Sequence, residues 1–335
     1  MSQNGQRSYT IGDIAKELGV SKTTISRAIS GKGRISKETQ ERVRQFIIEH
    51  NYQPNIMAKG LAQNKTFNIG LAMPEEFGIG DLPFFQHSVN GICQTAAQND
   101  YDVILFRITS DNLSQMKRII KNHKVDGIIL TRTQCDDYPV RLLKENGIPF
   151  VVIGSSLDTE VTHADNDHIS ACKMLTELLL NRGLKHFALI GGNMEYFVNK
   201  SRLRGYQMAF EEHPGEEVTS VTYLNVIKEF QIVKAVDDAL SVGTDCIVCM
   251  DDFICSRVVA QLSERSVRIP DDVSVATFYS SMLLEHNNPL ITGLEFDAAK
   301  IGGIACQMLI DILDGKHVSD YVSPDYRLFM GNSVK

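Results

Sequence analysis

The feature that most constrains the fold is a series of short, almost entirely apolar segments that recur from Phe67 onward, with helical stretches between them. Segments of this length without polar alternation are typical of strands buried on both faces, as in parallel sheets built from strand–helix–strand units. The candidate strands are Asn68–Met73, Asp102–Phe106, Gly127–Leu130, Pro149–Ile153, Phe187–Ile190, Cys246–Cys249 and Val273–Ala276. The sequence therefore predicts an α/β core.

A weak internal repeat indicates that this core has two similar halves. Val125–Leu130 is followed by a helical stretch and then by Gly147–Ile153, which contains an Ile-Pro pair. Thr244–Cys249 is followed in the same way by Ile269–Ala276, which begins with Ile-Pro. We expect two α/β lobes with a cleft between them, and ligands of such folds bind beyond the carboxyl ends of the strands.

The first 65 residues differ in charge from the remainder of the chain. They contain eleven Lys/Arg and five Asp/Glu, a net charge of +6, whereas the whole chain carries −7 and the remainder therefore −13. A basic segment attached to an acidic body favours contact between that segment and a polyanion. Chance variation along the chain is the alternative.

Three short helices are predicted in this basic head. The residues with the i, i+3, i+4, i+7 spacing of a buried helix face are Ile11, Ile14, Ala15 and Leu18. Thr10 and Asp13 are spaced as a capping box for this first helix. Gly19 ends the first helix, and Ser21 and Ser36 are suitable N-caps for the second and third helices.

A helix, a short glycine-containing turn and a second helix form the helix-turn-helix pattern, whose second helix lies in the DNA major groove. The outward-facing residues of the second helix are Lys22, Thr23, Ser26 and Arg27. Their side chains can donate to guanine or phosphate, or contact a thymine methyl. Ser21 and Thr24, at the helix N-terminus, are suited to phosphate. A solvated face of a small helical bundle is the alternative.

Tyr9–Ser30 reads YTIGDIAKELGVSKTTISRAIS, and this run resembles the head of the lactose/galactose repressor (LacI/GalR) family. Ser36–Val43, Asn51–Asn55 and Ala58–Ala62 resemble the same family, and the resemblance continues through essentially the whole chain. It implies an α/β fold in which an N-terminal all-α helix-turn-helix head precedes a two-lobed core like that of periplasmic binding proteins, with two Rossmann-like parallel sheets.

The resemblance also implies the domain boundaries. The head would cover residues 7–54, a hinge helix or linker 55–65, and the ligand-binding and dimerisation core 66–335. Within the core, the N-lobe would comprise about 66–163 and 292–322, and the C-lobe about 164–291 and 323–335. The chain would cross between the lobes near residues 163, 291 and 323.

In this family the hinge helix orders on DNA, pairs with its dimer mate and inserts a leucine into the minor groove. Leu61 matches that leucine, and Gly60 replaces the usual non-glycine residue, at a cost to helix formation of about 1 kcal/mol relative to Ala. A plain linker is the alternative. The complete DNA-binding set implied is Ser21, Lys22, Thr23, Thr24, Ser26, Arg27, Ser36, Asn55, Ala58 and Leu61.

The resemblance also implies a ligand site. Leu82–Phe85 resembles an Asn-Pro-Phe-Phe motif whose aromatic rings line the cleft, with Leu82 in place of Asn, and Arg202 aligns with the ligand-clamping arginine. Asp251 begins an acidic pair that follows its strand and would contact the ligand. The predicted ligand-binding residues are Phe84, Phe85, Ser155, Arg202, Asp251, Phe253 and Tyr279.

Each of these residues also has a plainer interpretation. Arg202 could form a surface ion pair, Asp251 could cap a helix, and the aromatic residues could belong to the core. As a set, however, they suit a polyol, because carboxylate and guanidinium groups bind hydroxyls and aromatic faces pack on sugar C–H groups. Gly154 and Tyr279 stand where relatives carry acids, which makes the site more aromatic. We therefore expect a small-molecule effector that is a carbohydrate.

Other chemistry is not indicated. Cys246 and Cys249 lie within one apolar strand, which favours buried free thiols over a metal site. No nucleotide-binding or hydrolase motif is present, so we expect no cofactor, no metal, no catalytic residues and no enzymatic activity. No apolar run of membrane-spanning length occurs, and the first ten residues lack a signal-peptide segment, so a cytoplasmic chain with no membrane contact is expected.

The sequence therefore predicts a homodimeric DNA-binding transcriptional regulator, a repressor, that binds a pseudo-palindromic double-stranded operator and responds to a sugar bound between the core lobes. One alternative within this class is a co-repressor-dependent regulator that binds a purine or a protein partner. Outside the class, the alternatives are a solute-binding protein, which would lack the basic head, and an α/β enzyme, for which no catalytic constellation is present.

Overall fold

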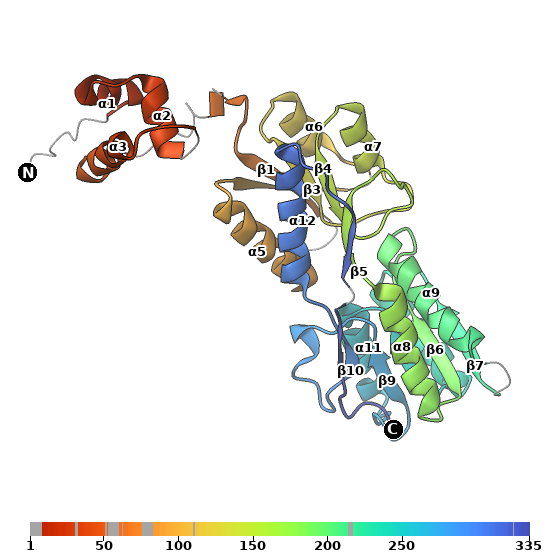
Figure 1. Ribbon diagram of the computed structural model, residues 1–335. Coiled ribbons are helices and arrows are strands. Elements are labelled where there is room, and N and C mark those ends of the chain that lie inside the picture. The colour runs from red at the N-terminus through yellow and green to blue at the C-terminus, as the bar shows by residue number, and fades with distance from the viewer. Residues whose placement is uncertain are drawn as a thin grey trace, which may run out of the picture. The chain divides into compact units, whose positions relative to one another are not determined.

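A computed structural model of the protein describes residues 9–30, 33–50, 52, 60–61, 63–75, 83–109, 111–213, 217–323 and 325–335. The chain separates into two compact units, Met1–Thr66 and Phe67–Lys335, which we call the head and the core. Figure 1 shows the helices of the head and the layered sheets of the core. No helix in the described ranges combines the length and the apolar character needed to cross a membrane.

The head contains α1 (Ile11–Leu18), α2 (Lys22–Ser30) and α3 (Lys37–Glu49). These helices enclose a small core of buried residues: Ile14, Ala15, Ile25, Val43, Phe46 and Tyr52. The predicted capping box is confirmed, because the Asp13 carboxylate accepts from the Thr10 amide at 2.9 Å and the Thr10 side chain accepts from the Asp13 amide. Gly19 ends α1 in the left-handed conformation. The helix-turn-helix arrangement is thus present.

The core contains two six-stranded sheets. The N-lobe sheet, in the order β11-β5-β4-β3-β1-β2, is formed by β1 (Asn68–Pro74), β2 (Asp102–Ile108), β3 (Gly127–Leu130), β4 (Phe150–Ile153), β5 (His163–Asn166) and β11 (Tyr321–Ser323). The C-lobe sheet, in the order β12-β10-β9-β8-β6-β7, is formed by β6 (His186–Ile190), β7 (Thr219–Tyr223), β8 (Cys246–Cys249), β9 (Ser274–Thr277), β10 (Thr292–Glu295) and β12 (Arg327–Phe329). Among these described strands, β10 and β12 pair antiparallel and the other neighbours pair parallel.

The two sheets share one topology. The order β2-β1-β3-β4-β5 in the N-lobe is repeated as β7-β6-β8-β9-β10 in the C-lobe. The internal repeat predicted from the two Ile-Pro segments is therefore confirmed. In each sheet the strand order reverses at the first strand of the repeat: β1 lies between β2 and β3, and β6 lies between β7 and β8. Ligands of such folds bind at the carboxyl ends of the strands next to this reversal.

Helices cover both faces of each sheet (Figure 1). In the N-lobe, α5 (Pro83–Gln98) and α12 (Ala298–Leu313) pack on one face, and α6 (Ser114–Lys121) and α7 (Tyr138–Glu145) pack on the other. In the C-lobe, α8 (His168–Asn181) and α9 (Phe197–Glu211) pack on one face, and α10 (Glu229–Ser241) and α11 (Asp252–Glu264) on the other. Burial on both faces explains why the central strands β1, β3, β4, β6, β8 and β9 are largely continuous apolar runs.

The chain crosses between the lobes at positions that differ from the expected ones. β5 continues to Asn166 within the N-lobe sheet, and β10 belongs to the C-lobe sheet, so the first two crossings follow Asn166 and Glu295 instead of lying near residues 163 and 291. The third crossing lies between Ser323 and Arg327. The sequences of β5 (HADN), β10 (TGLE) and the edge strand β7 (TSVTY) lack the apolar run that marks the central strands, so the pattern did not reveal them.

The two cysteines of β8 lie on opposite faces of the C-lobe sheet. Cys246 packs against α8 and α9, and Cys249 packs against α10 and α11, as the spacing of three residues along a strand predicts. Both side chains are fully buried free thiols.

Glycines allow α5 and α12 to pack with their backbones almost in contact. A Cβ atom on Gly302 would lie 2.2 Å from the Ser88 carbonyl oxygen of α5, and a Cβ atom on Gly91 would lie 1.9 Å from the Ala299 carbonyl oxygen of α12. A backbone oxygen cannot move aside as a flexible side chain can. The N-lobe layer therefore depends on glycine at these positions.

We expect Gly302→Ala to lower the free energy of unfolding by at least about 1 kcal/mol, because the overpacking cost exceeds the gain in helix propensity. Gly303→Ala is the matched control, since it adds the same methyl group to the same helix. Its Cβ atom would lie 3.0 Å from the Thr95 hydroxyl, a side-chain group, and 3.6 Å from the Gly91 carbonyl oxygen, which is an ordinary contact. Urea unfolding of both variants measures the difference. Equal stabilities of the two variants would contradict the close helix contact.

Candidate functional site

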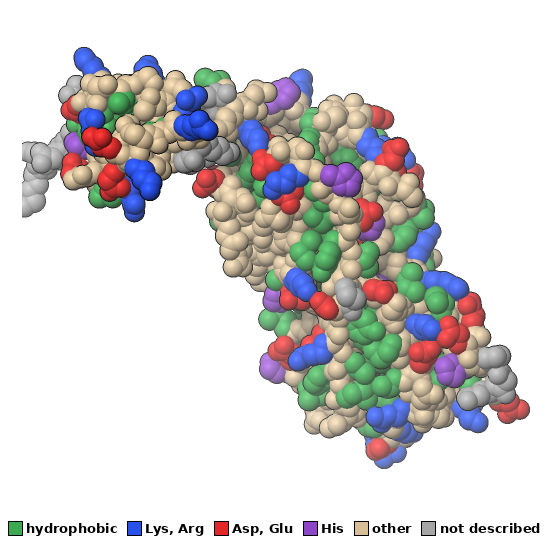
Figure 2. Space-filling view, in the orientation of Figure 1, with side chains coloured by type: hydrophobic (Ala, Val, Ile, Leu, Met, Phe, Trp, Pro, Cys, Tyr) green, Lys and Arg blue, Asp and Glu red, His purple; other side chains and the backbone are tan. Residues whose placement is uncertain are grey.

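The exposed face of α2 carries the residues predicted to read DNA bases. The side chains of Lys22, Thr23, Ser26 and Arg27 are exposed, whereas Ile25 is fully buried in the head core. Figure 2 shows Lys and Arg side chains standing out over the head. The alternation of buried and exposed positions therefore fixes which face of α2 is available to a partner.

The hydroxyl residues at the helix starts have local roles in the head. The Ser21 side chain accepts from the Thr24 amide at 3.1 Å and lies 2.8 Å from the Thr24 hydroxyl. Ser36 caps α3 in the same way, by accepting from the Thr39 amide at 3.1 Å. These caps stabilise the helix starts and leave exposed amide and hydroxyl groups there, which is compatible with phosphate contacts.

The predicted hinge falls largely outside the described residues. Asn55 and Ala58 are not described, and neither is Leu82 of the core. Gly60 is buried, and Leu61 lies beside it in helical conformation with 89% of its surface exposed. An apolar side chain this exposed is available for contact with a partner molecule.

A cleft of about 640 Å³ lies between the two lobes of the core. Its lining comes from the carboxyl ends of β1, β3, β4 and β5 in the N-lobe and of β6, β7, β8 and β9 in the C-lobe, together with the segments that follow them. The residues are Pro83–Phe85, Thr131–Gln134, Asp136, Ile153, Gly154, Asp165, His168, Gly192, Asn193, Glu195, Tyr196, Val198, Asn199, Arg202, Val226, Ile227, Asp251–Ile254 and Tyr279. Both lobes thus contribute the ligand-binding edges of their sheets.

The four predicted aromatic residues all line this cleft. Phe84 and Phe85 of α5 lie edge to face, with ring centroids 5.6 Å apart, and Phe84 meets Tyr279 of the opposite lobe at 6.0 Å. Tyr279 is largely buried, whereas Phe84, Phe85 and Phe253 are half-buried. Core packing and cleft lining are therefore combined in the same side chains.

Arg202 and Asp251 lie close together on the C-lobe side of the cleft. Arg202 is only 8% exposed and its guanidinium carbon is 5.9 Å from the centre of the Tyr279 ring, which excludes the surface ion pair considered from the sequence. Asp251 caps α11 by accepting from the Ile254 amide at 2.8 Å. The helix cap that the sequence offered as the plainer interpretation is thus present, and the same carboxylate lines the cleft.

Asp252 adds a second buried carboxyl group. The Ser281 hydroxyl donates a hydrogen bond to it, and its side chain lines the cleft. Burial raises the pKa of Asp252 to about 6, and the neighbouring Asp251 carboxylate adds to the rise. Burial also raises the pKa of Asp251 itself. This side of the cleft therefore concentrates hydrogen-bonding carboxyl groups around one buried arginine.

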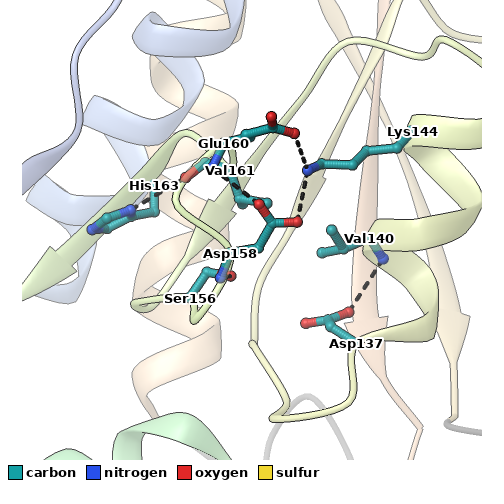
Figure 3. Close-up of polar contacts among 8 residues, drawn as sticks. All are labelled: Asp137, Val140, Lys144, Ser156, Asp158, Glu160, Val161 and His163. Carbon is teal, nitrogen blue, oxygen red and sulfur yellow. Dashed lines mark hydrogen bonds and ion pairs between the residues drawn. The ribbon is translucent and has the colours of Figure 1, made fainter.

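Ser155 contacts the cleft through another residue. Its amide and hydroxyl donate to the Asp165 carboxylate at 2.8 and 2.7 Å, and Asp165 lines the cleft. Ser155 is not among the lining residues in the described part of the chain. The loop that follows it is fixed on the outer side by Lys144 of α7, which donates to Asp158 at 2.6 Å and to Glu160 at 3.1 Å (Figure 3).

Several lining residues were missed in the sequence. Thr131–Gln134 and Asn193 follow strands that the apolar runs did reveal, so the rule on strand ends could have found them. Asp165 lies within β5 and His168 follows it, and the polar sequence of this strand gave no signal. Asn199 donates to the Asn193 carbonyl at 2.8 Å and thereby orders the loop after β6.

The two lobes also contact each other directly at the edge of the cleft. We call this contact the interlobe clasp and define it as residues 132–135 with 194–197. The Cys135 amide donates to the Glu195 carbonyl at 3.0 Å, and the Phe197 amide donates to the Thr133 carbonyl at 3.2 Å. The Arg132 guanidinium stacks 3.8 Å from the centre of the Tyr196 ring. The clasp therefore holds the lobes together independently of the crossings.

The arrangement suits binding of a polar, uncharged or weakly charged ligand. Carboxylate and guanidinium groups provide acceptors and donors, and four aromatic rings provide apolar faces. Within the described residues, no group of three or more His, Cys, Asp or Glu side chains is placed to hold a metal ion.

Comparison with known protein families decides the assignment. Residues 66–326 match the family described as periplasmic binding proteins and sugar binding domain of the LacI family. Residues 10–55 match the family described as bacterial regulatory proteins of the lacI family. The chain belongs to the LacI family. The resemblance inferred from the helix-turn-helix motif and the predicted α/β architecture are both confirmed, and LacI-family relatives are regulators, not enzymes.

Two relatives within the LacI family are HTH-type transcriptional regulators named MalR. The protein from Staphylococcus xylosus is 30% identical over 322 residues, which cover 93% of this chain and 94% of that protein. The protein from Streptococcus pneumoniae serotype 4 is 36% identical over 207 residues, which cover 61% of this chain and 63% of that protein. This second match therefore spans less than two thirds of the relative's length.

Two solved structures show the same fold. The lac repressor dimer bound to operator and the anti-inducer ONPF is 20% identical, with a TM-score of 0.75, and the match covers 98% of this chain and 99% of that chain. The transcriptional regulator CelR in complex with cellobiose is 23% identical, with a TM-score of 0.72, and covers 97% and 99%.

If the exposed face of α2 reads bases, Thr23→Ala and Arg27→Ala each remove one base contact. We therefore predict that each variant reduces discrimination between a preferred DNA duplex and one with a single base-pair change by about 1–3 kcal/mol. The preferred duplex is selected from a random pool, and affinities are measured by fluorescence anisotropy. Arg44→Ala, which removes the same charge from the exposed surface of α3, is the control and should leave the discrimination unchanged. Unaltered discrimination in both α2 variants would contradict base reading by this face.

Two buried groups of the cleft make opposite contributions to the pH dependence of stability. Burial raises the pKa of Asp252 from 3.8 to about 6. The stabilisation of the folded state that this shift provides is therefore complete below about pH 4 and is lost as the pH rises to about 6. Burial lowers the pKa of His168 from 6.5 to about 4. The stabilisation of the folded state that this shift provides is therefore complete above about pH 6.5 and is lost as the pH falls to about 4.

We therefore expect Asp252→Asn to make the free energy of unfolding rise more steeply with pH between 4 and 6, and His168→Asn to make it rise less steeply. Each change across this window is about 2–3 kcal/mol. Urea unfolding at several pH values measures both slopes. Slopes that match the wild-type protein would show that these groups titrate normally.

Proposed function

We propose that this protein is a homodimeric transcriptional repressor that binds a pseudo-palindromic double-stranded operator and changes its operator affinity when a carbohydrate binds between the core lobes. A single observation carries the proposal. One chain of the LacI family combines a head whose α2 exposes basic and hydroxyl side chains with a core that has a polar and aromatic cleft.

The chemistry of the cleft supports a sugar. Arg202 and Asp251 both line the cleft, and guanidinium and carboxylate groups bind neighbouring hydroxyl groups through charge-assisted hydrogen bonds. Phe84, Phe85 and Tyr279 present aromatic faces and edges to the same space. The volume of about 640 Å³ falls within the range of about 300–1,000 Å³ that is usual for small-molecule sites. The cellobiose complex of CelR, which shares this fold, supports the same class of ligand.

The interlobe clasp supports a mechanism based on lobe closure. A ligand that contacts both lobes binds the closed arrangement more tightly than an open one and shifts the population toward it. The head precedes the core in the sequence and is joined to it through residues 55–65, which we propose form the hinge. A change in closure in each protomer would then alter the spacing of the two heads on DNA.

The cellular setting of the proposal follows from its partner. A regulator of bacterial operators acts where the chromosome is, so we propose that the protein is cytoplasmic. The relatives are bacterial regulators, and none of the described helices could span a membrane.

We predict that Arg202→Ala weakens sugar binding by about 1.5–3 kcal/mol, because a buried charge-assisted hydrogen bond is lost. The measurement is a thermal-shift titration with maltose, cellobiose, trehalose, their 6-phosphates and purines, of which a sugar should stabilise the wild-type protein. Arg204→Ala, which removes an exposed arginine from the same helix, is the matched control.

DNA affinity without sugar should be the same in the wild-type protein and in both variants. Equal sugar affinity in the Arg202→Ala variant would contradict the assigned role of this residue. Stabilisation by purines alone would contradict a carbohydrate effector.

A further inference from the structure

His168 lies in the first turn of α8, directly after the first crossing between the lobes. Its side chain is only 5% exposed and lines the cleft. The imidazole packs against the Phe296 ring, with centroids 4.7 Å apart, and so has a fixed orientation. This is a buried, titratable side chain at the cleft, next to the crossing about which the lobes are joined.

One nitrogen of His168 faces a carboxylate that determines the tautomer. Nε2 lies 3.5 Å from Oδ1 of Asp165. The Asp165 carboxylate accepts hydrogen bonds from Ser155 through Oδ2 and from the Asn166 amide through Oδ1. Because an ionised carboxylate only accepts hydrogen bonds, the proton of a neutral imidazole is favoured on Nε2, which leaves a lone pair on Nδ1.

Burial, and to a lesser extent nearby positive charge, favours the neutral imidazole of His168. Burial lowers the pKa of His168, and the Arg202 guanidinium lowers it further against the opposing effect of Asp165. At neutral pH the ring therefore offers one acceptor at Nδ1, and this atom is buried without a protein hydrogen-bond partner. A buried polar atom left in this state costs about 1–3 kcal/mol.

Arg202 presents the complementary group. Its Nε atom is also buried without a protein partner, and this residue lines the same cleft. One unsatisfied acceptor and one unsatisfied donor at the same cleft match a hydroxyl-bearing ligand, because a hydroxyl group both donates and accepts. A phosphate oxygen, which at neutral pH mainly accepts, would satisfy only Arg202 and would face the carboxylates of Asp165 and Asp251.

We propose that His168 is an effector-specificity residue whose Nδ1 accepts a hydrogen bond from a hydroxyl group of a neutral sugar, while Arg202 Nε donates to an oxygen of the same ligand. The proposal rests on the proposed sugar-binding function and assigns to it a residue and a preference for unphosphorylated sugars. A purely structural role, in which the imidazole only supports Phe296, is the outcome that the test must distinguish.

The test compares His168→Leu, which removes the acceptor, with His168→Asn, whose Oδ1 occupies a position equivalent to Nδ1. His163→Leu is the matched control, because its Nδ1 lies 3.3 Å from the Val161 carbonyl and it is not among the residues that line the cleft in the described chain. Calorimetric titrations use maltose, cellobiose and trehalose, their 6-phosphates, and the series of mono-deoxy derivatives of whichever sugar binds the wild-type protein.

We expect His168→Leu to weaken binding of that sugar about tenfold or more, and His168→Asn and His163→Leu to stay within about threefold of the wild-type affinity. One mono-deoxy derivative, which lacks the hydroxyl that contacts His168, should bind the wild-type protein more weakly than the parent sugar does. The His168→Leu variant should bind this derivative and the parent sugar with equal affinity. Such coupling marks a direct contact. The 15N resonance of His168 Nδ1 should shift when the parent sugar binds and should not shift with that derivative.

Other outcomes overturn the proposal in distinguishable ways. If the parent sugar binds the wild-type protein and His168→Leu equally, the role of His168 is wrong and the proposed function stands. If His168→Leu binds weakly but no mono-deoxy derivative is coupled to it, the residue has a structural role only. Tighter binding of a 6-phosphate than of its parent sugar overturns the preference for neutral ligands. If none of the sugars binds the wild-type protein, both this inference and the proposed function are wrong.

Discussion

The crossings between the lobes are the constraint on which the core depends. β5 of the N-lobe leads directly into α8 of the C-lobe, and β10 of the C-lobe leads directly into α12 of the N-lobe. Each lobe therefore needs a helix that begins at a crossing, and neither lobe is a continuous piece of chain. Movement of one lobe against the other is confined to these short connections, which makes rigid closure around a single cleft the natural motion.

The same constraint brings the cleft residues of the two lobes together. The two sheets repeat one strand order, so the same strand-end positions in each lobe face the cleft. His168 and Asp165 lie at a crossing, Arg202 and Asp251 belong to the C-lobe, and Phe84 belongs to the N-lobe. The affinity of a ligand that contacts all of these groups depends on how far the lobes are closed. The interlobe clasp contributes to the closed arrangement even without a ligand.

Much of this molecule could be predicted from the sequence, for identifiable physical reasons. The strands Gly127–Leu130 and Cys246–Cys249 were found because they are buried on both faces and hence apolar throughout. The caps at Thr10 and Ser36 were found because capping depends on local spacing. β5 and β10 were missed because short strands at the crossings carry polar residues, and the lobe boundaries were displaced as a result. The pairing of His168 with Asp165 and the interlobe clasp depend on tertiary contacts that no local pattern encodes.

The central claim is that occupation of the cleft controls binding of the head to DNA, and DNA affinity measured as a function of sugar concentration tests it most directly. Because coupling between two sites is reciprocal, DNA affinity should move between two plateaus, with half of the change near the dissociation constant of the sugar. DNA affinity that stays constant while the sugar saturates the protein would contradict the account.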